Sequence, residues 1–179
     1  MSSEAQAVQD AVGEAPVAAP ETKSMTIIVT KGSLDWAYPP FILATTAAAM
    51  GLNVTMFFTF YGLPLLLKDL KLQVTAAGNP AMKMPMGGIH MGLPNLVTAI
   101  PGVDAMCSKM MKNLIKKKGV ASIEDLREAA VESDVRMIGC QMTMDLFEYE
   151  QKDMIEGIDI GGAATYIECA TQSEINLFI

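Results

Sequence analysis

Met25-Thr26-Ile27-Ile28-Val29-Thr30 is the stretch of sequence that decides the fold, because its β-branched residues predict a strand. Residues 35–50 follow, and their alanines favour a helix that ends at Gly51. Residues 53–59, Asn53-Val54-Thr55-Met56-Phe57-Phe58-Thr59, then predict a second strand of continuous apolar character. Strand, helix and strand in this order make the crossover unit of a parallel sheet that is covered on both faces.

The next predicted helix follows Pro101-Gly102, begins at Asp104, which caps it, and ends at Gly119. Its apolar side is formed by Met106, Met110, Met111, Leu114 and Ile115. The basic run Lys116-Lys117-Lys118 lies at the negative end of this helix, where it favours helix stability. Docking of an acidic partner at this run is the alternative.

Three further segments complete the sheet. Ser122, with Asp125 three residues later, has a capping-box-like spacing and starts a helix that leads into a strand at residues 135–138. A helix that begins near Gly161-Gly162 precedes the last strand, residues 175–179. The sequence therefore predicts a three-layer α/β fold with a mostly parallel sheet of about five strands, whose functional loops lie at the carboxyl ends of the strands.

The chain of 179 residues has the length of a single domain with a tail. Residues 1–24 combine acidic residues with Ala, Pro, Val and Ser, which predicts a disordered N-terminal tail without the features of a signal peptide. Residues 25–179 are expected to form one domain. Within it, residues 72–102 are rich in methionine, glycine and proline, and loops of this length are usually functional or mobile.

Composition argues against several classes of function. A formal net charge of -7 and a pI near 4.7 disfavour binding to nucleic acid, and no nucleic-acid motif is present. The three widely spaced cysteines form neither a disulfide framework nor a metal knuckle, so we expect reduced thiols in the cytoplasm. No glycine-rich dinucleotide or phosphate fingerprint occurs, and we expect no cofactor.

Residues 39–67 form an uncharged stretch that exceeds the length of about 20 residues needed to cross a bilayer. Pro39-Pro40, Gly51 and Gly62-Leu63-Pro64 interrupt this stretch. The resulting segments suit a buried α/β core better than one continuous span, so we do not expect the chain to span a membrane.

Cys140 is the main candidate for a functional residue. It follows the strand at residues 135–138 and Gly139, and it precedes a helix predicted over residues 141–147. The amide N–H groups and the positive dipole end of that helix stabilise a thiolate and lower the pKa of a cysteine at this position. The alternative is that Cys140 is a small apolar core residue, which cysteine commonly is.

Other candidates give weaker signals. Residues 82–91 hold His90 and four methionines, which are ligands for Cu(I), but a methionine-rich segment is more often a lid or an interface, and we expect no metal site. Cys107 has the spacing of a helical core position and is expected to be structural. Cys169 shares a predicted helix face with Tyr166 and is a candidate for a second sulfur site.

Three motifs stand out together with the C-terminal residues Asn176-Leu177-Phe178-Ile179. They are Thr30-Lys31-Gly32-Ser33-Leu34-Asp35-Trp36-Ala37, Gly139-Cys140-Gln141-Met142-Thr143-Met144-Asp145-Leu146 and Gly161-Gly162-Ala163-Ala164-Thr165-Tyr166. Over residues 25–179 the chain resembles the DsrE/DsrF-like family, specifically its subgroup associated with rhodanese and TusA sulfur carriers. The resemblance implies a flavodoxin-like subunit, a homo-oligomer that is a trimer or a multiple of one, and a persulfide on Cys140.

The leading hypothesis is a sulfur-relay protein, either a sulfurtransferase or a sulfur carrier. Cys140 holds sulfane sulfur as a persulfide and exchanges it with a TusA-like or rhodanese-like donor or acceptor protein. Lys31, Asp35, Gln141 and His90 are the expected neighbours of Cys140. The alternatives are a non-catalytic oligomeric binding module of the same fold and a copper-handling protein that uses the methionine-rich loop.

Overall fold

The computed structural model describes residues 22–75, 83–86, 89–92 and 102–179, and it describes residues 83–86 and 89–92 by their backbone alone. In chain order, the elements of the main body are β1 (Ser24–Val29), α1 (Leu34–Ala49), β2 (Asn53–Phe58), the 3₁₀ helix η1 (Phe60–Leu66), α3 (Val103–Lys117), α4 (Ile123–Glu132), β5 (Arg136–Cys140), α5 (Gln141–Phe147), the 3₁₀ turn η2 (Gln151–Asp153), β6 (Asp159–Gly161), α6 (Ala163–Thr171) and β7 (Ile175–Phe178). A separate antiparallel hairpin consists of β3 (Lys83–Met86) and β4 (Ile89–Gly92).

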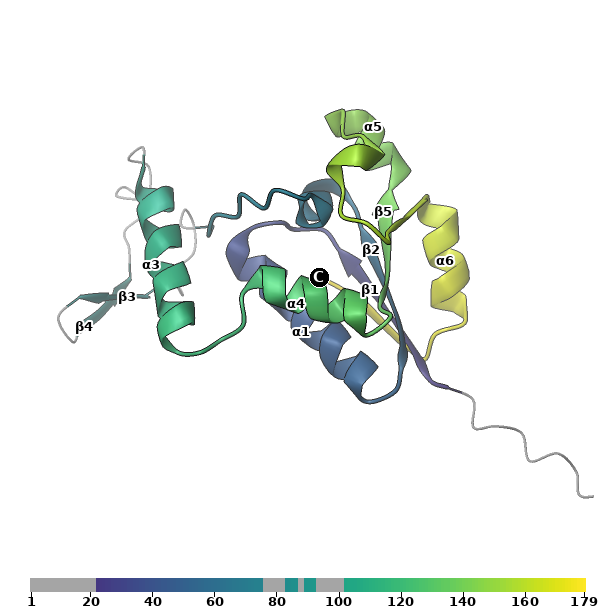
Figure 1. The fold of residues 1–179 in the computed structure, drawn as a ribbon, viewed down its shortest axis with the longest axis horizontal. Helices are drawn as coiled ribbons and strands as arrows, with labels where there is room; N and C mark the ends of the chain where they lie inside the picture. The colour runs from purple at the N-terminus through teal and green to yellow at the C-terminus, as the bar shows by residue number, and fades with distance from the viewer. Residues whose placement is uncertain (1–21, 76–82, 87–88, 93–101) are drawn as a thin grey trace, which may run out of the picture.

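The five strands of the main sheet are parallel and lie in the order β6-β5-β2-β1-β7. Helices α1 and α4 lie on one side of the sheet, and α6 lies on the other side (Figure 1). The predicted three-layer, flavodoxin-like α/β fold with about five mostly parallel strands is therefore confirmed.

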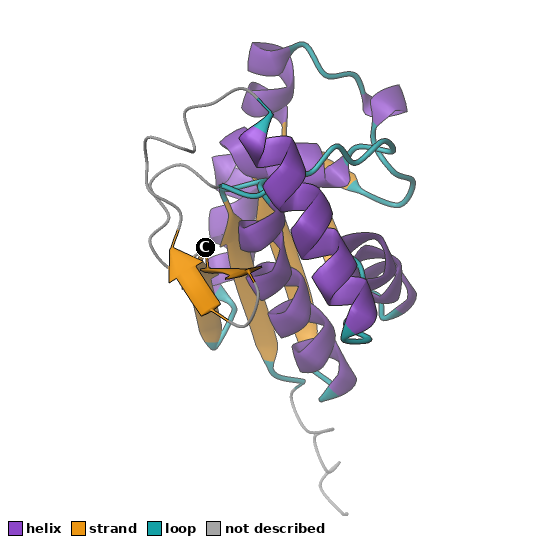
Figure 2. Ribbon diagram, turned by 90° about the vertical axis from the view of Figure 1, so that its left-hand side faces the viewer, coloured by secondary structure: helices purple, strands orange, loops and turns teal. Residues whose placement is uncertain are grey.

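The main core fills the space between the sheet and the helices α1 and α4, which lie in front of the strands in Figure 2. Ile27 and Met56 point into this core from adjacent strands and are fully buried. Phe41 of α1 packs on Phe58 of β2 with a distance of 5.9 Å between ring centroids. Burying each of these large side chains contributes about 1.5–3 kcal/mol to folding, so this layer contributes strongly to stability.

A second, smaller core lies on the α6 side of the sheet. Its buried members are Phe57, Ile138, Cys140 and Tyr166, with Ile28 and Ala170 packed against them. Side chains of a strand alternate between the two faces, so residues 136, 138 and 140 of β5 all point to this side. The candidate thiol therefore belongs to the thinner layer of the molecule.

The uncharged stretch at residues 39–67 folds as predicted into the body of α1, the strand β2 and η1. Gly51 ends the helix with a φ of 83°, a left-handed conformation that glycine adopts without strain. No helix in the described part of the chain has the length and apolar character needed to cross a membrane. The first strand begins at Ser24, one residue inside the predicted tail, and residues 1–21 lie outside the described residues.

The predicted start of the helix α3 was wrong. Gly102, with a φ of 93°, is the N-cap residue, and Asp104 lies in the first turn. The Oδ1 atom of Asp104 is buried and has no hydrogen-bond partner among the described residues. A glycine takes the cap position because the chain enters the helix through a left-handed conformation, which disfavours an aspartate there.

The predicted apolar side of α3 was also partly wrong. Met106 and Leu114 are 55% and 40% exposed, whereas Cys107 and Ser108 are buried. Ser108 can take a core-facing position because its hydroxyl donates to the Asp104 carbonyl oxygen at 2.6 Å and accepts from the Val74 amide at 2.9 Å. A satisfied hydroxyl costs little to bury, and the pattern of apolar residues alone does not reveal it.

The predicted loop at residues 72–102 begins in the core. Leu72 and Val74 are buried, and the hairpin of β3 and β4 lies within the same segment. The strand β6, at Asp159–Gly161, was not located from the sequence because three residues are too few to produce an alternating pattern.

Candidate functional site

The carboxyl ends of the parallel strands meet at one edge of the sheet, and Cys140 lies there as the last residue of β5. Its backbone is extended, with a φ of −71° and a ψ of 114°, and it is the N-cap residue of α5. The strand therefore ends, and the helix begins, at the residue that bears the thiol, as the sequence predicts.

The side chain of Cys140 is 4% exposed and packs in the small core on the α6 side. The rings of Phe57 and Tyr166 lie next to each other in this core, with 5.4 Å between their centroids. On the opposite face of β5, a Cβ atom at Gly139 would lie 3.3 Å from Leu63, so a glycine leaves room for η1 to pack on the sheet. The thiol therefore belongs to the small apolar core and lies at its carboxyl-edge end.

Two hydroxyl groups lie beside this thiol. Thr143, three residues after Cys140, is fully buried, and its Oγ1 accepts a hydrogen bond from the Phe60 amide at 3.1 Å. The Oγ1 of Thr59, at the end of β2, lies 3.2 Å from the Oγ1 of Thr143. Because the Phe60 amide occupies one lone pair of Thr143, the Thr143 hydroxyl proton is available to Thr59 or to the Cys140 sulfur.

These groups determine the pKa of Cys140. Burial raises the pKa of the thiol, but hydrogen bonding from Thr143 (side chain and amide), the Thr59 side chain and the Met142 amide lowers it, and the net pKa lies below the ordinary 9.0. The Cys140 side chain makes no capping hydrogen bond at the start of α5. The lower pKa of Cys140 therefore results from several polar contacts acting together. A larger fraction of Cys140 is therefore thiolate at neutral pH than in an ordinary cysteine.

An apolar rim surrounds this end of β5. Phe60 and Tyr61 of η1 are 45% and 69% exposed, and Met142 and Leu146 of α5 are each 58% exposed. The ring of Tyr61 stacks on that of Phe147 at 5.8 Å. A concentration of exposed large apolar side chains around one site is typical of a surface that contacts another molecule.

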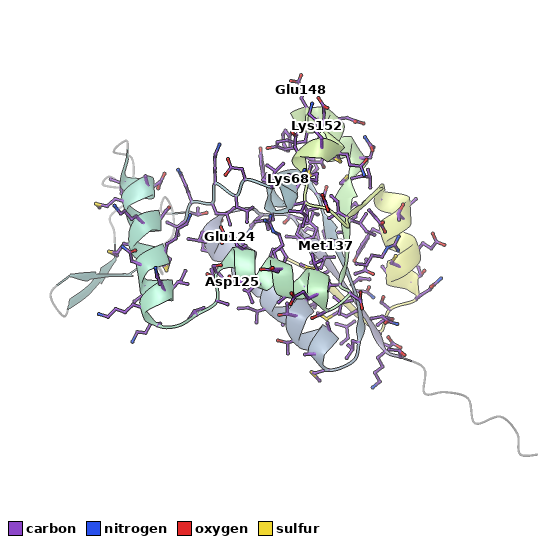
Figure 3. All side chains as sticks on the ribbon, in the orientation of Figure 1. Lys68, Glu124, Asp125, Met137, Glu148 and Lys152 are labelled. Atoms are coloured by element: carbon purple, nitrogen blue, oxygen red, sulfur yellow. The ribbon has the colours of Figure 1, made fainter. Side chains whose placement is uncertain are left out.

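A groove of about 590 Å³ opens at the same end of the molecule, and Gly32, Leu67 and Tyr149 contribute to its walls. Lys68 and Lys152 also line it, and both lie at the α5 end of the structure (Figure 3). The Lys68 ammonium group donates to the Lys152 carbonyl oxygen at 2.9 Å. Cys140 is not among the residues that line this groove.

Two of the predicted neighbours of Cys140 stabilise the segment after β1. The Lys31 ammonium group lies 3.3 Å from the centroid of the Trp36 ring, a cation–π contact. Asp35 accepts a hydrogen bond from the Thr75 amide at 3.0 Å and thereby attaches residues 73–75 to the start of α1. Neither contact involves Cys140.

The other two predicted neighbours also lack a described contact with the thiol. The Gln141 side chain donates to Asp145 at 2.7 Å, one helical turn further along α5. His90 lies in β4, where only the backbone is described, and its side chain lies outside the described residues, as do those of the methionines at residues 82–91.

The remaining cysteines lie away from the carboxyl edge. Cys107 is buried on α3, in the structural position that the sequence predicts. Cys169 is partly buried near the end of α6, and its Sγ accepts a hydrogen bond from Arg136 at 3.4 Å. Arg136 is the first residue of β5 and Cys140 is the last, so Cys169 lies at the opposite end of the sheet from the candidate site.

Sequence reasoning missed both threonines. Thr143 occupies the third helical position after the N-cap residue Cys140, which is the position whose amide faces an N-cap side chain. That spacing was a usable signal. Thr59 gave no such signal, because its contact depends on β2 and β5 being neighbours in the sheet.

The described residues contain no group of three or more His, Cys, Asp or Glu side chains placed to hold a metal ion. The groups that surround the Cys140 thiol in this site are neutral hydrogen-bond donors, namely the side chains of Thr143 and Thr59 and the amides of Thr143 and Met142.

Comparison with known proteins places the chain in a family. Residues 21–178 match the model of the DsrE/DsrF/DrsH-like family. The chain is 55% identical over 159 residues to the "Sulfur carrier protein DsrE2" of Allochromatium vinosum, covering 89% of this chain and 99% of that protein. It is 36% identical over 162 residues to the "Uncharacterized protein YrkE" of Bacillus subtilis, covering 89% of this chain and 98% of that protein.

Among solved structures, the ychN protein from E. coli aligns with a TM-score of 0.49 and 12% identity, covering 87% of this chain and 99% of that one. The family match spans nearly all of the described residues, including every strand of the main sheet. The chain belongs to the DsrE/DsrF/DrsH-like family.

Proposed function

We propose that this protein is a sulfur-relay protein that holds sulfane sulfur on Cys140 and exchanges it with thiol partners. The observation that carries the proposal is the position of Cys140 at the carboxyl edge of the sheet, among donors that lower the pKa of its thiol. The 55% identical relative named a sulfur carrier supports the choice of sulfur as the cargo.

The exchange is a nucleophilic displacement at sulfur. The Cys140 thiolate attacks the outer sulfur of a donor persulfide, a new S–S bond forms on Cys140, and the donor S–S bond breaks to release the donor thiolate. The proton of the transferred sulfhydryl group stays with the outer sulfur or passes to the donor thiolate. Attack by an acceptor thiolate on the outer sulfur reverses these steps, so the cycle requires no external oxidant or reductant.

Thr143 and Thr59 have defined roles in this proposal. Their hydroxyl groups, with the Met142 and Thr143 amides, stabilise the anionic sulfur before attack and after the acceptor has taken the cargo. These hydroxyl and amide groups are neutral donors, so they stabilise the anionic sulfur without placing a full positive charge beside it. A modest stabilisation of this kind suits a carrier, which must release sulfur as readily as it takes it up.

The partner in this proposal is a protein that brings its own cysteine to the rim of exposed apolar residues beside Cys140. TusA-like and rhodanese-like proteins are the expected donors or acceptors. We also propose that the chain acts as a homo-oligomer, a trimer or a multiple of one, in the cytoplasm, where cysteines remain reduced.

One observation favours a second candidate function. Cys140 is 4% exposed, and an inert, buried thiol would suit a non-catalytic binding module of the same fold. Titration of the native protein with a thiol reagent near neutral pH separates the candidates. Prompt modification of one thiol at Cys140 supports the relay, and modification only after unfolding supports the module.

The direct test is mass spectrometry of the purified chain after treatment with polysulfide. We expect a mass gain of about one sulfur atom on the peptide that contains Cys140. Cys140→Ser should abolish the gain, and Cys169→Ser, the matched control, should retain it. Loading of Cys107 or Cys169 in the Cys140→Ser variant would contradict the proposal.

A further inference from the structure

The two edges of the main sheet differ in how they are protected. Strand β6 has three residues, and Asp159 at its start forms an ion pair with Arg136. Short length and charge are the usual means of preventing an edge strand from pairing with another chain. Strand β7, at Ile175–Phe178, forms the other edge and contains no charged residue and no proline.

The hydrogen bonds of β7 show which of its backbone groups have no partner among the described residues. Ile179 donates its amide to the Ile28 carbonyl oxygen and accepts from the Thr30 amide, so both of its backbone groups face β1. In a parallel ladder this direction alternates along the strand. Leu177 therefore also faces β1, and the amide and carbonyl groups of Asn176 and Phe178 face outward from the sheet.

Two of the four side chains of this edge strand are large, apolar and exposed. Phe178 is 75% exposed, and Ile175 is 41% exposed. Phe178 pairs in register with Ile28 of β1, which packs in the small core on the α6 side. The edge of the sheet and an aromatic side chain beside it thus form one continuous surface that a further strand would cover.

We propose that β7 pairs with β7 of a second copy of this chain, antiparallel and about a two-fold axis at Leu177. In this register Asn176 of each copy lies opposite Phe178 of the other, and each such pair exchanges two backbone hydrogen bonds. All four outward groups of each strand are then satisfied by an identical strand. The central pair, Leu177 with its copy, is the pair without hydrogen bonds, where side chains approach most closely.

The same geometry covers the exposed aromatic residue. The two Phe178 side chains lie on the same face of the joined sheet as diagonal neighbours, about 7–8 Å apart and within reach of each other. A second copy is the occupant that fits, because the surface is self-complementary, as a two-fold contact requires. The joined sheet has ten strands, and the assembly has an even number of subunits, so of the assemblies proposed above this contact requires a hexamer or a larger even multiple of three and is incompatible with a single trimer.

Cysteine cross-linking tests the register. In a chain with Cys140→Ser and Cys169→Ser, Leu177→Cys should form a disulfide-linked dimer under mild oxidation, because the two copies of residue 177 face each other. Ile175→Cys, on the same face of the same strand, is the matched control and should stay uncoupled, because its opposite residue is 179. Equal cross-linking of both variants, or no cross-linking of Leu177→Cys, would overturn the register.

Light scattering of the full chain tests the surface. The wild type should have a mass that is an even multiple of 19.2 kDa, and Phe178→Lys should halve that mass by placing like charges at the contact. Met50→Lys is the control, because Met50 is also 75% exposed but lies after α1. A monomeric wild type, an odd number of subunits, or an unchanged mass for Phe178→Lys would refute the contact.

This inference rests on the assembly part of the proposed function and is independent of the sulfur chemistry. Three strand spacings, about 14 Å, separate β7 from β5, which bears Cys140. Phe178→Lys should therefore still take up sulfur on Cys140 when treated with polysulfide. An unchanged mass for Phe178→Lys would refute only the β7 contact. Failure of the wild type to take up sulfur on Cys140 would refute only the sulfur chemistry.

Discussion

Two cysteines lie at opposite ends of β5, on the same face of the sheet but in different surroundings. Cys140 belongs to β5 itself, and Cys169 belongs to α6. At the carboxyl end, Cys140 lies among the hydroxyls of Thr59 and Thr143 and the first amides of α5. At the amino end, Cys169 accepts a hydrogen bond from Arg136, whose Nε also donates to Asp159 at 2.7 Å. Four residue steps along the strand, about 13 Å, separate these two ends.

The difference shows what the topology of a parallel sheet supplies by itself. A helix that follows a strand begins at the carboxyl edge and directs unpaired amides toward it. A helix that precedes a strand ends at the amino edge, where its carbonyl groups remain, and the Cys169 carbonyl oxygen accepts from the Gln172 amide and the Ser173 hydroxyl. A donor for sulfur is therefore provided by the backbone at Cys140, but only by an arginine side chain at Cys169.

The largest expected effect on the free energy of unfolding comes from a substitution that disturbs only the Cys140 end of the sheet. Gly62→Ala should lower the free energy of unfolding by about 3 kcal/mol, because a Cβ atom there would lie 2.2 Å from the Val29 carbonyl oxygen. The added methyl group would meet backbone atoms of Val29 and Thr30, which cannot rotate away as a side chain could. The clash is relieved only if η1 moves away from β1. Urea unfolding followed by circular dichroism measures the change.

Gly162→Ala is the matched control for this experiment. Gly162 lies at the same edge of the sheet, before α6, and a Cβ atom there meets nothing within 4 Å. We expect a change of less than about 0.5 kcal/mol for this variant. Equal destabilisation by the two variants would mean that the close approach of η1 to β1 does not hold the site in place.

The sequence predicts the Cys140 end better than its surroundings because local patterns determine it. A strand at residues 135–138, a glycine and a helix over residues 141–147 are all contiguous, and they place Cys140 at the strand-to-helix junction without any long-range information. The capping box of α4 at Ser122 and Asp125 was predicted for the same reason and is present. Local propensity and spacing carry this information.

Features that depend on distant segments were not predictable in this way. The contact of Thr59 with Thr143 requires β2 and β5 to be adjacent, and the start of α3 at Gly102 depends on a left-handed residue. The burial of Ser108 depends on the Val74 amide, 34 residues away along the chain. Tertiary contacts decide these positions, and no periodicity in a single sequence encodes them.

Thr143→Val should slow alkylation of Cys140 at neutral pH about tenfold, because a hydrogen bond to a charged group contributes about 1.5 kcal/mol. Valine keeps the shape of the fully buried side chain but removes the hydroxyl that contacts the sulfur. The rate of reaction with iodoacetamide, resolved by peptide mapping, measures this effect. Thr143→Ser retains the hydroxyl and should react at nearly the wild-type rate, and an equal loss in both variants would assign the effect to packing.

The pH dependence of Cys140 sharpens the same point. Because the pKa of Cys140 in the folded state lies below the ordinary 9.0, the midpoint of its alkylation rate should lie below that pH. The folded state then binds fewer protons than the unfolded state, so the thiolate contributes stability above 9.0 that is lost as the pH falls through the folded pKa. Comparison of wild-type unfolding with that of Cys140→Ala across this window measures the contribution, and a midpoint above 9.0 would contradict it.

The smallest expected effect on stability and sulfur loading comes from substitutions that disturb only the Cys169 end of β5. Arg136 and Asp159 are 48% and 52% exposed, so their ion pair is screened by solvent, and Arg136→Gln should change the free energy of unfolding by less than about 1 kcal/mol. Sulfur loading of Cys140, measured by mass spectrometry after polysulfide treatment, should stay at the wild-type level, because no described contact joins Arg136 to the donors around Cys140. Asp159→Asn removes the same ion pair while leaving the guanidinium beside Cys169, and it should likewise leave loading unchanged. A several-fold loss of loading in either variant would mean that the two ends of β5 are coupled, and the sulfur site would then extend along the whole face of the strand to Cys169.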